Sequence, residues 1–372
     1  MLAKVKTVIA YMEELAPSSI AMSGDPVGLQ IGHPEAEVKK ILAALDPDHY
    51  AVKEAEEVGA EMLVTHHPLF YHQVASINES LPTGNLAAAV LRKRMHIFSA
   101  HTNYDIAPRG VNYRLAEALG LAADQGQVVE VTGNEQLLKL VVFIPAGHED
   151  RVRDAIAEAG AGKMGNYSHC TFQLPGTGTF MPGEGTDPYI GTRYELEKVD
   201  ELRMETILPA TKKQEVIKAL IEAHPYEEVA YDLYPLALEG RNIGLGLYFD
   251  LEKPVSLEYL IDKCKGVLKA EPLRCWDAGK SSFSRIAVCG GSGGSLIEQA
   301  ARLGAEAFVS GDFRYHDLKL AQSHGLALVD AGHDATEWPG VANIRAYLEE
   351  RLKADGYETG VCLQTTVSSG WK

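Results

Sequence analysis

The sequence predicts an α/β fold with largely parallel sheets and flanking helices, interrupted by an inserted α+β domain. Short apolar runs alternate with helical patterns up to about residue 130 and again from Ile243, an order that builds β-α-β units and parallel sheets. Between these parts, residues 131–239 follow the order β-α-β-β-α-β of a ferredoxin-like module. We therefore expect a discontinuous core, formed by 1–130 and 240–372, with one inserted domain at 131–239.

The composition is that of an ordinary globular protein. The 372 residues are 46% hydrophobic and 23% charged, which suits about two or three domains with a sizeable core. The net charge of −16 opposes a nucleic-acid surface, which needs clustered Lys and Arg. The five scattered cysteines form no Cys-x-x-Cys pair, and no apolar run approaches the ~20 residues of a membrane span. A cytoplasmic protein without a membrane or nucleic-acid partner is expected.

The N-terminal part begins with a helix and a glycine-rich loop. Apolar residues at helical spacing over 2–15 predict a helix that ends before Pro17. The loop at 24–32 contains Asp25, which has two interpretations: a carboxylate that supports a functional site, or a turn aspartate before proline. A strand at 41–45 and a helix at 50–59 are expected next.

The next apolar run, Met62–Val64, ends in His66, His67 and Pro68. A strand covered on both faces needs apolar residues but has no need of two adjacent histidines, and proline then ends the strand. One histidine here would be read as a hydrogen-bonded loop residue. For two in succession, a metal site and a pair of hydrogen-bonded loop histidines are equal alternatives.

A second short strand repeats this pattern. After a helix at 85–94, the buried run 95–100 ends in His101 and Asp105, and a helix at 111–119 completes the unit. Asp105 can ligate a metal directly, while His101 can ligate one or support a ligand. Because ligands collect beyond the carboxyl ends of parallel strands, these groups are expected to share one edge of the sheet.

The inserted segment contains fewer candidate functional residues than the core. Strands at 137–144 and 229–234 and helices at 150–159 and 212–223 enclose a stretch of alternating polar and apolar residues. Its His224-Pro-Tyr-Glu-Glu228 stretch is either a site or a helix-to-strand loop with a surface histidine.

The C-terminal part resumes the α/β pattern. A helix is expected at 256–265, and strands at 285–289, 307–310 and 326–330. The first strand runs into the loop Gly290–Gly294, which either cradles an anion or allows tight strand-to-helix packing.

The other two strands end in polar residues. One is followed by Asp312 and His316, and the other by His333 and Glu337, which open a helix that reaches about Lys353. The i, i+4 spacing places His333 and Glu337 on one helix face, where they can hold one ion. The alternative is a capping histidine and a solvated glutamate.

Taken together, four strands end in His or Asp, and all four ends are expected on one sheet edge. Nitrogen and carboxylate ligands without thiolates suit divalent Zn, Mn, Fe or Ni. His66 and His67 point to different sides, so that each could serve one ion, and a bridging Glu337 would hold two ions ~3.5–4 Å apart. Asp312 or His316 could orient a ligand or shuttle a proton.

Several motifs of this sequence resemble those of a known protein family. Thr-His66-His67-Pro, His101-Thr-Asn-x-Asp105, Ser-Gly-Asp312-x-x-x-His316 and Gly-His333-x-Ala-Thr-Glu337 resemble the motifs of the YqfO/YbgI-like family. Its members are commonly labelled GTP cyclohydrolase 1 type 2 homologues. Asp25-x-Val-Gly-Leu-Gln30 and the closing stretch 365–370 are also similar to the family. The resemblance covers essentially the whole chain.

The resemblance implies a site and an assembly. It implies a dinuclear metal site with His66, His67, Asp105, His333 and Glu337 as ligands. It also implies an inserted domain similar to PII and CutA proteins, and a homohexamer built as a trimer of dimers.

Two functions from different classes follow. The first is a metal-dependent hydrolase with two divalent ions per chain, zinc being the first choice, that acts on a small phosphate- or nucleotide-containing substrate. Glu337, Asp312 and His316 are its candidate catalytic residues. The second is a non-enzymatic, metal-binding regulatory or chaperone-like oligomer whose inserted domain senses a ligand or a partner.

Overall fold

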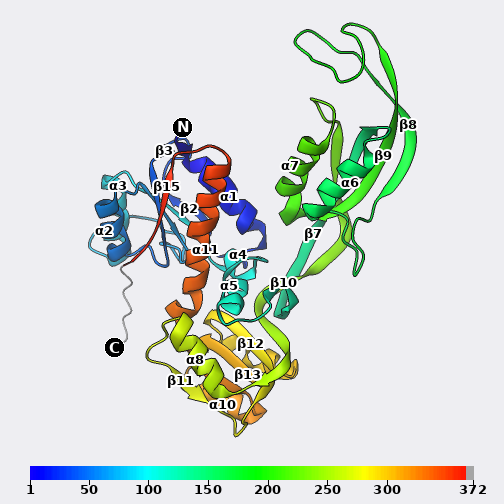
Figure 1. Ribbon diagram of the computed structural model, residues 1–372. Helices are drawn as coiled ribbons and strands as arrows, with labels where there is room; N and C mark the ends of the chain where they lie inside the picture. Colours follow the sequence, from blue (N-terminus) through cyan, green and yellow to red (C-terminus); the bar gives the residue numbers. More distant parts are fainter. Residues whose placement is uncertain (366–372) are drawn as a thin grey trace. The chain divides into compact units, whose positions relative to one another are not determined.

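The computed structural model describes residues 1–365 (Figure 1) and divides into two compact units. The first unit contains Met1–Gly133 and the chain from Ile243 onward, and the second contains Asn134–Asn242. The predicted boundaries, at 131 and 239, fall near these limits, while the ferredoxin-like assignment of the insertion stays a prediction. The resembling stretch at 366–370 lies outside the described residues. Among residues 1–365, no helix combines the length and the apolar character that a membrane crossing requires.

The first unit contains a five-stranded sheet in which the parallel prediction is confirmed for four strands. Its strand order is β15 (Gly360–Leu363), β4 (Lys40–Ala44), β5 (Met62–Thr65), β6 (His96–Ser99) and β2 (Gly28–Ile31). The first four are parallel, and β2 pairs antiparallel with β6. A separate small ladder joins β1 (Ala3–Lys4) to β3 (Glu37–Val38).

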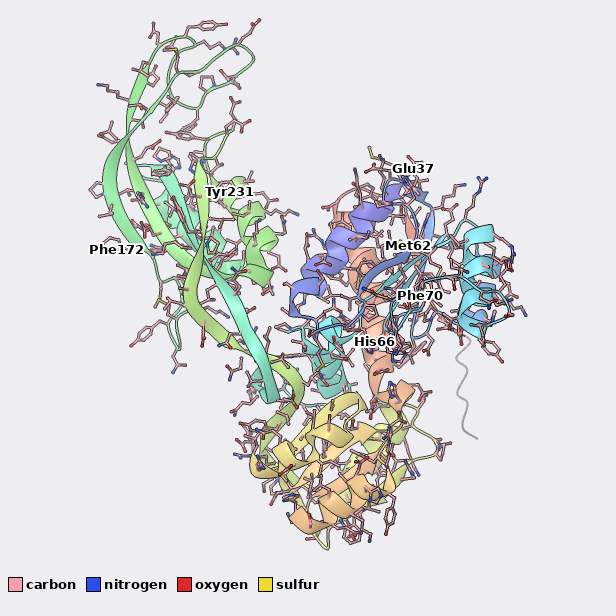
Figure 2. The ribbon with its side chains drawn as sticks, turned by 180° about the vertical axis from the view of Figure 1, so that it is seen from behind. Glu37, Met62, His66, Phe70, Phe172 and Tyr231 are labelled. Atoms are coloured by element: carbon pink, nitrogen blue, oxygen red, sulfur yellow. The ribbon has the colours of Figure 1, made fainter. Side chains whose placement is uncertain are left out.

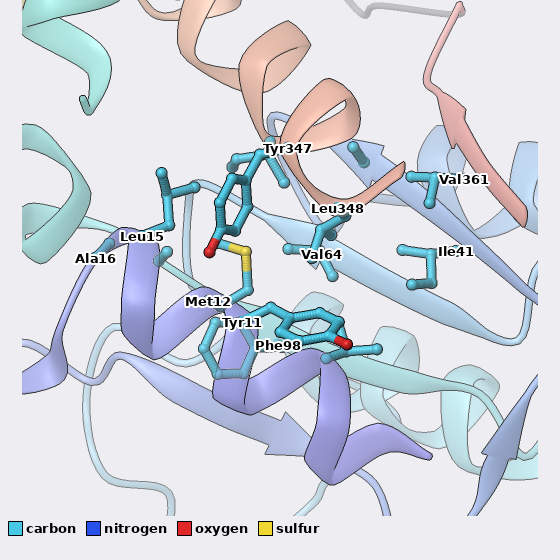
Figure 3. Packing of buried hydrophobic residues seen from close by; sticks show 14 of the residues in the cluster. Tyr11, Met12, Leu15, Ala16, Ile41, Val64, Phe98, Tyr347, Leu348 and Val361 are labelled. Carbon is cyan, nitrogen blue, oxygen red and sulfur yellow. The ribbon is translucent and has the colours of Figure 1, made fainter. Parts of the chain in front are cut away.

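Alternation along the strands explains how both faces of this sheet are covered. In β4, Leu42 and Ala44 pack with α2 (His49–Val58) and α3 (Pro82–Arg92). Ile41 and Ala43 face the opposite cluster, with α1 (Val5–Leu15) and α11 (His333–Ala354). Figure 3 shows this second cluster, with Met12 of α1 and Leu348 of α11 packed around Val64 of β5. The strand centres are therefore apolar, as their sequences predicted, although β4 begins with Lys40 and β6 with His96.

The second sheet of this unit has a parallel centre as well. Strands β12 (Phe283–Ser292), β13 (Ala307–Gly311) and β14 (Ala327–Asp330) are parallel, and β11 (Arg274–Trp276) adds antiparallel to β14. One face packs on α5 (Val111–Ala118) and α8 (Leu257–Val267), and the other on α9 (Ile297–Arg302) and α10 (Tyr315–His324).

Two long strands connect the units. β7 (Gln127–Pro145) leaves the first unit and β10 (Tyr231–Val255) returns to it, where β10 pairs antiparallel with β12. Within the second unit, β7 pairs antiparallel with β9 (Glu197–Pro209), and β9 pairs antiparallel with β8 (Phe172–Phe180).

The second unit has a core of its own. The helices α6 (Glu149–Glu158) and α7 (Lys213–Ala223) pack on the β7–β9 strands through one apolar cluster, which includes Leu140, Ile156 and Leu220. In contrast, Phe172 on β8 and Tyr231 at the start of β10, both labelled in Figure 2, are exposed. One side of this sheet is therefore a core face, and the other leaves large apolar side chains accessible.

Candidate metal centre

The first ligand candidates stand where two neighbouring parallel strands end. β5 is completely buried and delivers His66 and His67 directly after Thr65 (His66 is labelled in Figure 2). β6 ends at Ser99, and the chain turns through His101 into the short helix α4 (Thr102–Ile106), which carries Asp105. Thr65 and Ser99 share a register position and a 2.9 Å contact between their hydroxyl oxygens, so the two strand ends are held side by side.

The other candidates come from the second sheet. β13 leads to Asp312, and β14 leads to α11, which begins at His333 and carries Glu337 one turn later. The expectation of a single sheet edge was therefore wrong, because two of the four strand ends belong to each sheet. Helix α11 unites them, since it packs against β12 and β13 as well as β4 and β15.

Three histidines and two carboxylates converge on one point. His66 Nε2 lies 3.6 Å from Asp105 Oδ1 and 3.5 Å from Glu337 Oε1. The same oxygen, Glu337 Oε1, lies 3.1 Å from His333 Nε2. The other oxygen, Glu337 Oε2, lies 3.3 Å from His67 Nε2. The arrangement yields two overlapping groups that could hold a metal, His66–Asp105–Glu337 and His67–His333–Glu337. Glu337 is common to both, as the bridging role requires.

The second ring nitrogen of each histidine fixes the direction of the first. Nδ1 of His66 donates to the carbonyl oxygen of Ala100 at 2.8 Å. Nδ1 of His67 lies 2.8 Å from Asp46 Oδ1, and that of His333 lies 2.8 Å from Asp312 Oδ2. This is how proteins orient metal-binding imidazoles, because a proton on Nδ1 leaves the Nε2 lone pair for the ion.

Unpartnered atoms at the centre fit a metal ion. His66 Nε2, Asp105 Oδ1 and Glu337 Oε2 are buried and have no hydrogen-bond partner. In addition, the Nε2 atoms of His67 and His333 face each other at 3.3 Å, and two lone pairs at that distance repel unless a proton or a cation lies among them. Leaving buried polar atoms unsatisfied is costly. A cation bound here would satisfy all of these atoms together.

The electrostatics of the cluster agree with this. Burial alone would lower the pKa of His67, but Asp46 and Glu337 outweigh it and raise the pKa to about 10. The pKa of His333 likewise rises to about 9 against the effect of burial, because of Glu337 and Asp312. Burial raises the pKa of Asp105. For Glu337, burial opposes ionisation, but His66 and the other histidines hold the pKa well below its usual range. Positive charge beside the buried carboxylates therefore stabilises their ionised form.

His101 and Asp25 form a supporting pair at the edge of this cluster. Asp25 Oδ1 lies 2.9 Å from His101 Nδ1, and its other oxygen accepts bonds from the backbone N–H and hydroxyl of Thr102. His101 forms a third possible metal group with His66 and His67. The structure thus favours the supporting interpretation of Asp25 over a simple turn aspartate.

The glycine loop is explained by close packing. Gly291 has φ +66°, and a Cβ atom there would overlap Glu337 Oε1. A Cβ on Gly293 would overlap the Ser310 hydroxyl, and one on Gly294 would lie 2.8 Å from an oxygen of Asp317. An anion would meet carboxylates here, so the lack of side chains makes room for Glu337 at Gly291, and for Ser310 and Asp317 at Gly293 and Gly294.

Two histidines that the sequence analysis singled out lie away from the cluster, and two residues near the cluster were not predicted. His316 is exposed, and its ring contacts Tyr315 at 5.4 Å between centroids; within residues 1–365 no contact joins it to the cluster. His224 is buried in the second unit, where Nε2 donates to the Phe143 carbonyl. Asp46 and Tyr71 were missed, although Tyr71 stands edge-on to His101 with centroids 6.0 Å apart. Asp46 follows the end of β4 by two residues, a strand-end position like those of the other candidates, whereas Tyr71 follows no such motif.

Comparison with known proteins places this site in a family. The model of the Duf34/NIF3 (NGG1p interacting factor 3) family matches residues 3–368. This chain belongs to the Duf34/NIF3 family. A relative from Halalkalibacterium halodurans is 41% identical over 97% of this chain and 96% of its own length, and one from Bacillus subtilis is 38% identical over 88% and 87%. Both are named GTP cyclohydrolase 1 type 2 homolog, so the recognition from sequence motifs is confirmed.

Solved structures of the Duf34/NIF3 family share the fold. A Bacillus cereus protein described as related to NIF3 superposes with a TM-score of 0.78 at 38% identity, covering 100% of this chain and 99% of its own. A Staphylococcus aureus protein superposes with a TM-score of 0.68 at 26% identity, with the same coverage.

Proposed function

We propose that this chain is a dinuclear metal-dependent hydrolase of a small phosphate- or nucleotide-containing substrate. The observation that carries the proposal is the pair of ligand groups that share Glu337, each completed by a histidine whose Nδ1 is fixed. Two divalent ions bound by these residues would polarise a phosphoryl or carbonyl oxygen and make water nucleophilic at neutral pH. Zinc is the first choice for this N/O set, with Mn, Fe or Ni as alternatives.

The residues divide between holding and positioning. His66 and Asp105 would hold one ion, and His67 and His333 the other, with Glu337 across both. Asp312 orients the His333 ring through its contact with Nδ1, and it does so from a backbone with φ +57°, which a non-glycine residue adopts only at some cost. Asp46 does the same for His67. We therefore assign Asp312 to positioning rather than to proton transfer.

Glu337→Gln is the direct test of the metal centre. The amide keeps the shape of the side chain but replaces the carboxylate common to both ligand groups, which removes a charge that both ions would need. Elemental analysis of gently purified protein should give about two ions per chain in the wild type and fewer than one in the variant. Hydrolysis of a panel of phosphate esters and nucleotides, GTP among them because of the relatives' name, should fall by at least ~100-fold.

Glu130→Gln, which lies outside the cluster, is the matched control and should leave both readings unchanged. Turnover that persists in metal-free Glu337→Gln would remove the basis of the proposal. A wild-type chain that takes up no Zn, Mn or Fe would do the same.

A metal-binding regulatory or chaperone-like oligomer with a ligand-sensing insertion is the second candidate function. The observation that favours it is a cavity of about 660 Å³ contained within Asn134–Asn242, a volume suited to small-molecule binding. Full metal content without hydrolysis of any compound in the panel would support this function over the first.

We also propose that the chain assembles as a homohexamer, a trimer of dimers. Light scattering should then give about six times the chain mass of 40.4 kDa, and a monomeric mass at micromolar concentration would contradict the assembly.

A further inference from the structure

The cavity of the second unit is built mainly from the β8–β9 hairpin and two loops. Its volume is about 660 Å³, and its lining comes from β8, β9, the loop after β8, the loop after α7 and Phe143 of β7. Apolar atoms make up most of its wall. Every lining residue belongs to Asn134–Asn242, so the cavity is a different site from the metal centre.

Aromatic rings form one part of the wall. The ring of Tyr226 is edge-on to Phe180, with centroids 5.8 Å apart, and lies 6.3 Å from the ring of Tyr189. Tyr226 is held from both ends, since its hydroxyl donates to Glu201 at 3.1 Å and its backbone N–H donates to His224 Nδ1 at 3.1 Å. The rings thus offer π faces and edges in a fixed arrangement.

The charged groups of the wall are mostly acidic. Three carboxylates line the cavity, from Glu201, Glu227 and Glu228, against a single cation, Arg203. Arg203 is already paired, with its Nε 3.0 Å from Glu205 Oε1. Glu201 lies against Gly178 of β8, where a Cβ atom would overlap the carboxylate. Its position is therefore set by the strand pair as well as by Tyr226.

This combination selects the charge of the ligand. A phosphate or a carboxylate would meet three like charges and one arginine, whose Nε is already paired with Glu205, which is unfavourable. A cation would be attracted both by the carboxylates and by the aromatic faces. A mostly apolar wall also favours a ligand with an apolar body.

We propose that the second unit binds an organic cation with an apolar body, held between the Tyr226–Phe180–Tyr189 rings and the Glu201, Glu227 and Glu228 carboxylates. The ligand class is distinct from the phosphate-containing substrate proposed for the metal centre. The inference stands whether or not the metal centre hydrolyses anything.

Three probes with one aromatic body and different charges test this on the full-length chain. Isothermal titration is carried out with benzyltrimethylammonium, benzyl alcohol and benzenesulfonate. The cation should bind, with an affinity at least about tenfold above that of the neutral probe, and the anion should not bind measurably. Equal affinities for cation and alcohol, preference for the sulfonate, or no binding of the cation at millimolar concentration would each overturn the proposal.

Two variants test whether the cation binds in this cavity. Glu201→Gln keeps an acceptor for the Tyr226 hydroxyl but removes one charge, and it should weaken benzyltrimethylammonium about tenfold. Tyr226→Leu should weaken it further, with circular dichroism to check folding. Glu158→Gln on α6 removes an exposed charge outside the lining and should leave the affinity unchanged. If Glu158→Gln weakens the cation as much as Glu201→Gln, the effect is general electrostatics and the assignment fails.

A second copy of the chain could instead cover this wall in the assembled protein. Hydroxyl-radical footprinting of the wild type distinguishes the two. The proposal expects Tyr189 to be reactive and to become protected on adding benzyltrimethylammonium. Protection of Tyr189 in the assembly before any ligand is added would show that the wall is a subunit contact and would contradict the proposal.

Discussion

At the scale of single residues, Gly291 limits the space around Glu337. Its φ of +66° lies in the left-handed region, and a Cβ atom there would overlap Glu337 Oε1 and come within 3.2 Å of His333 Nε2. Gly291→Ala should therefore displace the shared ligand and lower metal content at least tenfold, while the backbone strain costs only about 1–2 kcal/mol of folding stability. Elemental analysis and a denaturation curve measure the two effects separately.

Gly325→Ala is the matched control for that substitution. Gly325 ends α10 with φ +61°, and a Cβ atom added there would have no neighbouring atom within 4 Å, so this position carries the same strain without the overlap. Both variants should lose similar stability, but only Gly291→Ala should lose metal. Metal loss in both would mean that strain, and not the position of Glu337, is responsible.

The sequence could predict the groups at the centre of the cluster and some, but not all, of the residues around them. His66 and His67 follow an apolar run directly, Asp105 lies in the short helix after the next one, and His333 and Glu337 share a helix face, so local patterns reveal all five. Asp46 follows the apolar strand β4, so the same strand-end pattern could have marked it, whereas Tyr71 has ordinary local surroundings. Their contacts with His67 and His101 arise only when distant segments meet, which no local pattern records.

At the scale of elements, the loop after α7 depends on one neutral histidine. His224 Nε2 donates to the Phe143 carbonyl at 3.0 Å, while its Nδ1 accepts from the Tyr226 N–H at 3.1 Å. A proton on Nδ1 would abolish the second bond. Burial accordingly lowers the pKa of His224 below its ordinary value of 6.5, with the bond to Phe143 opposing the shift only in part.

The sign of the resulting pH dependence follows from this lowered pKa. Between the folded pKa and 6.5 the unfolded chain binds more protons, so stability rises with pH in that window. The contribution of His224 is complete above about pH 6.5 and is lost as the pH falls through the folded pKa. Hydrogen exchange in residues 213–230, corrected for intrinsic rates, should show weaker protection at pH 5 than at pH 7.5.

His224→Gln should remove most of that difference, because the amide can still donate and accept but does not titrate. His169→Gln, an exposed histidine of the same unit, should leave the difference in place. Equal protection of the wild type at both pH values would contradict the role given to His224.

Most elements were predictable because their patterns are unambiguous. The strands β4, β5, β6, β13 and β14 have apolar centres and are followed by polar residues, and α11 begins at His333 as its spacing predicted. The antiparallel pairing of β2 with β6 was not predictable, because edge pairing depends on partners far away in the sequence. Helix α10 was missed because Asp312 and His316 were read only as strand-end residues.

At the scale of the molecule, the site exists because two sheets contribute to it. The local pattern at each strand end is the same, so nothing in the sequence distinguishes one sheet edge with four ends from two edges with two ends each. The answer lies in α11, which contacts both sheets and has buried residues along its whole length, from Thr336 to Leu352. The sequence of such a helix predicts that it is buried, but it does not predict which elements it packs against.

At the scale of the whole molecule, we also predict that the inserted unit, Asn134–Asn242, can be removed. The four apolar clusters of the first unit contain no residue of Asn134–Asn242, and the cluster of the second unit contains no residue outside it. The chain also leaves and returns at neighbouring points, since Thr132 Oγ1 donates to the Ile243 carbonyl and Asn134 Nδ2 donates to Glu239 Oε2 at 3.0 Å. Replacing residues 135–241 by a two-residue Asn-Gly turn therefore suits the strand pair.

The shortened chain separates the two candidate functions. If the first unit is the hydrolase, it should fold, keep about two ions and retain turnover within about threefold of the full chain, because no ligand lies in the deleted segment. Circular dichroism, elemental analysis and the phosphate-ester panel measure these properties. A folded, metal-loaded chain with no turnover, beside an active full-length protein, would show that the insertion is part of the catalytic apparatus. A full-length protein that binds metal and benzyltrimethylammonium but hydrolyses nothing would instead identify a sensor, because binding would then be its only measurable chemistry.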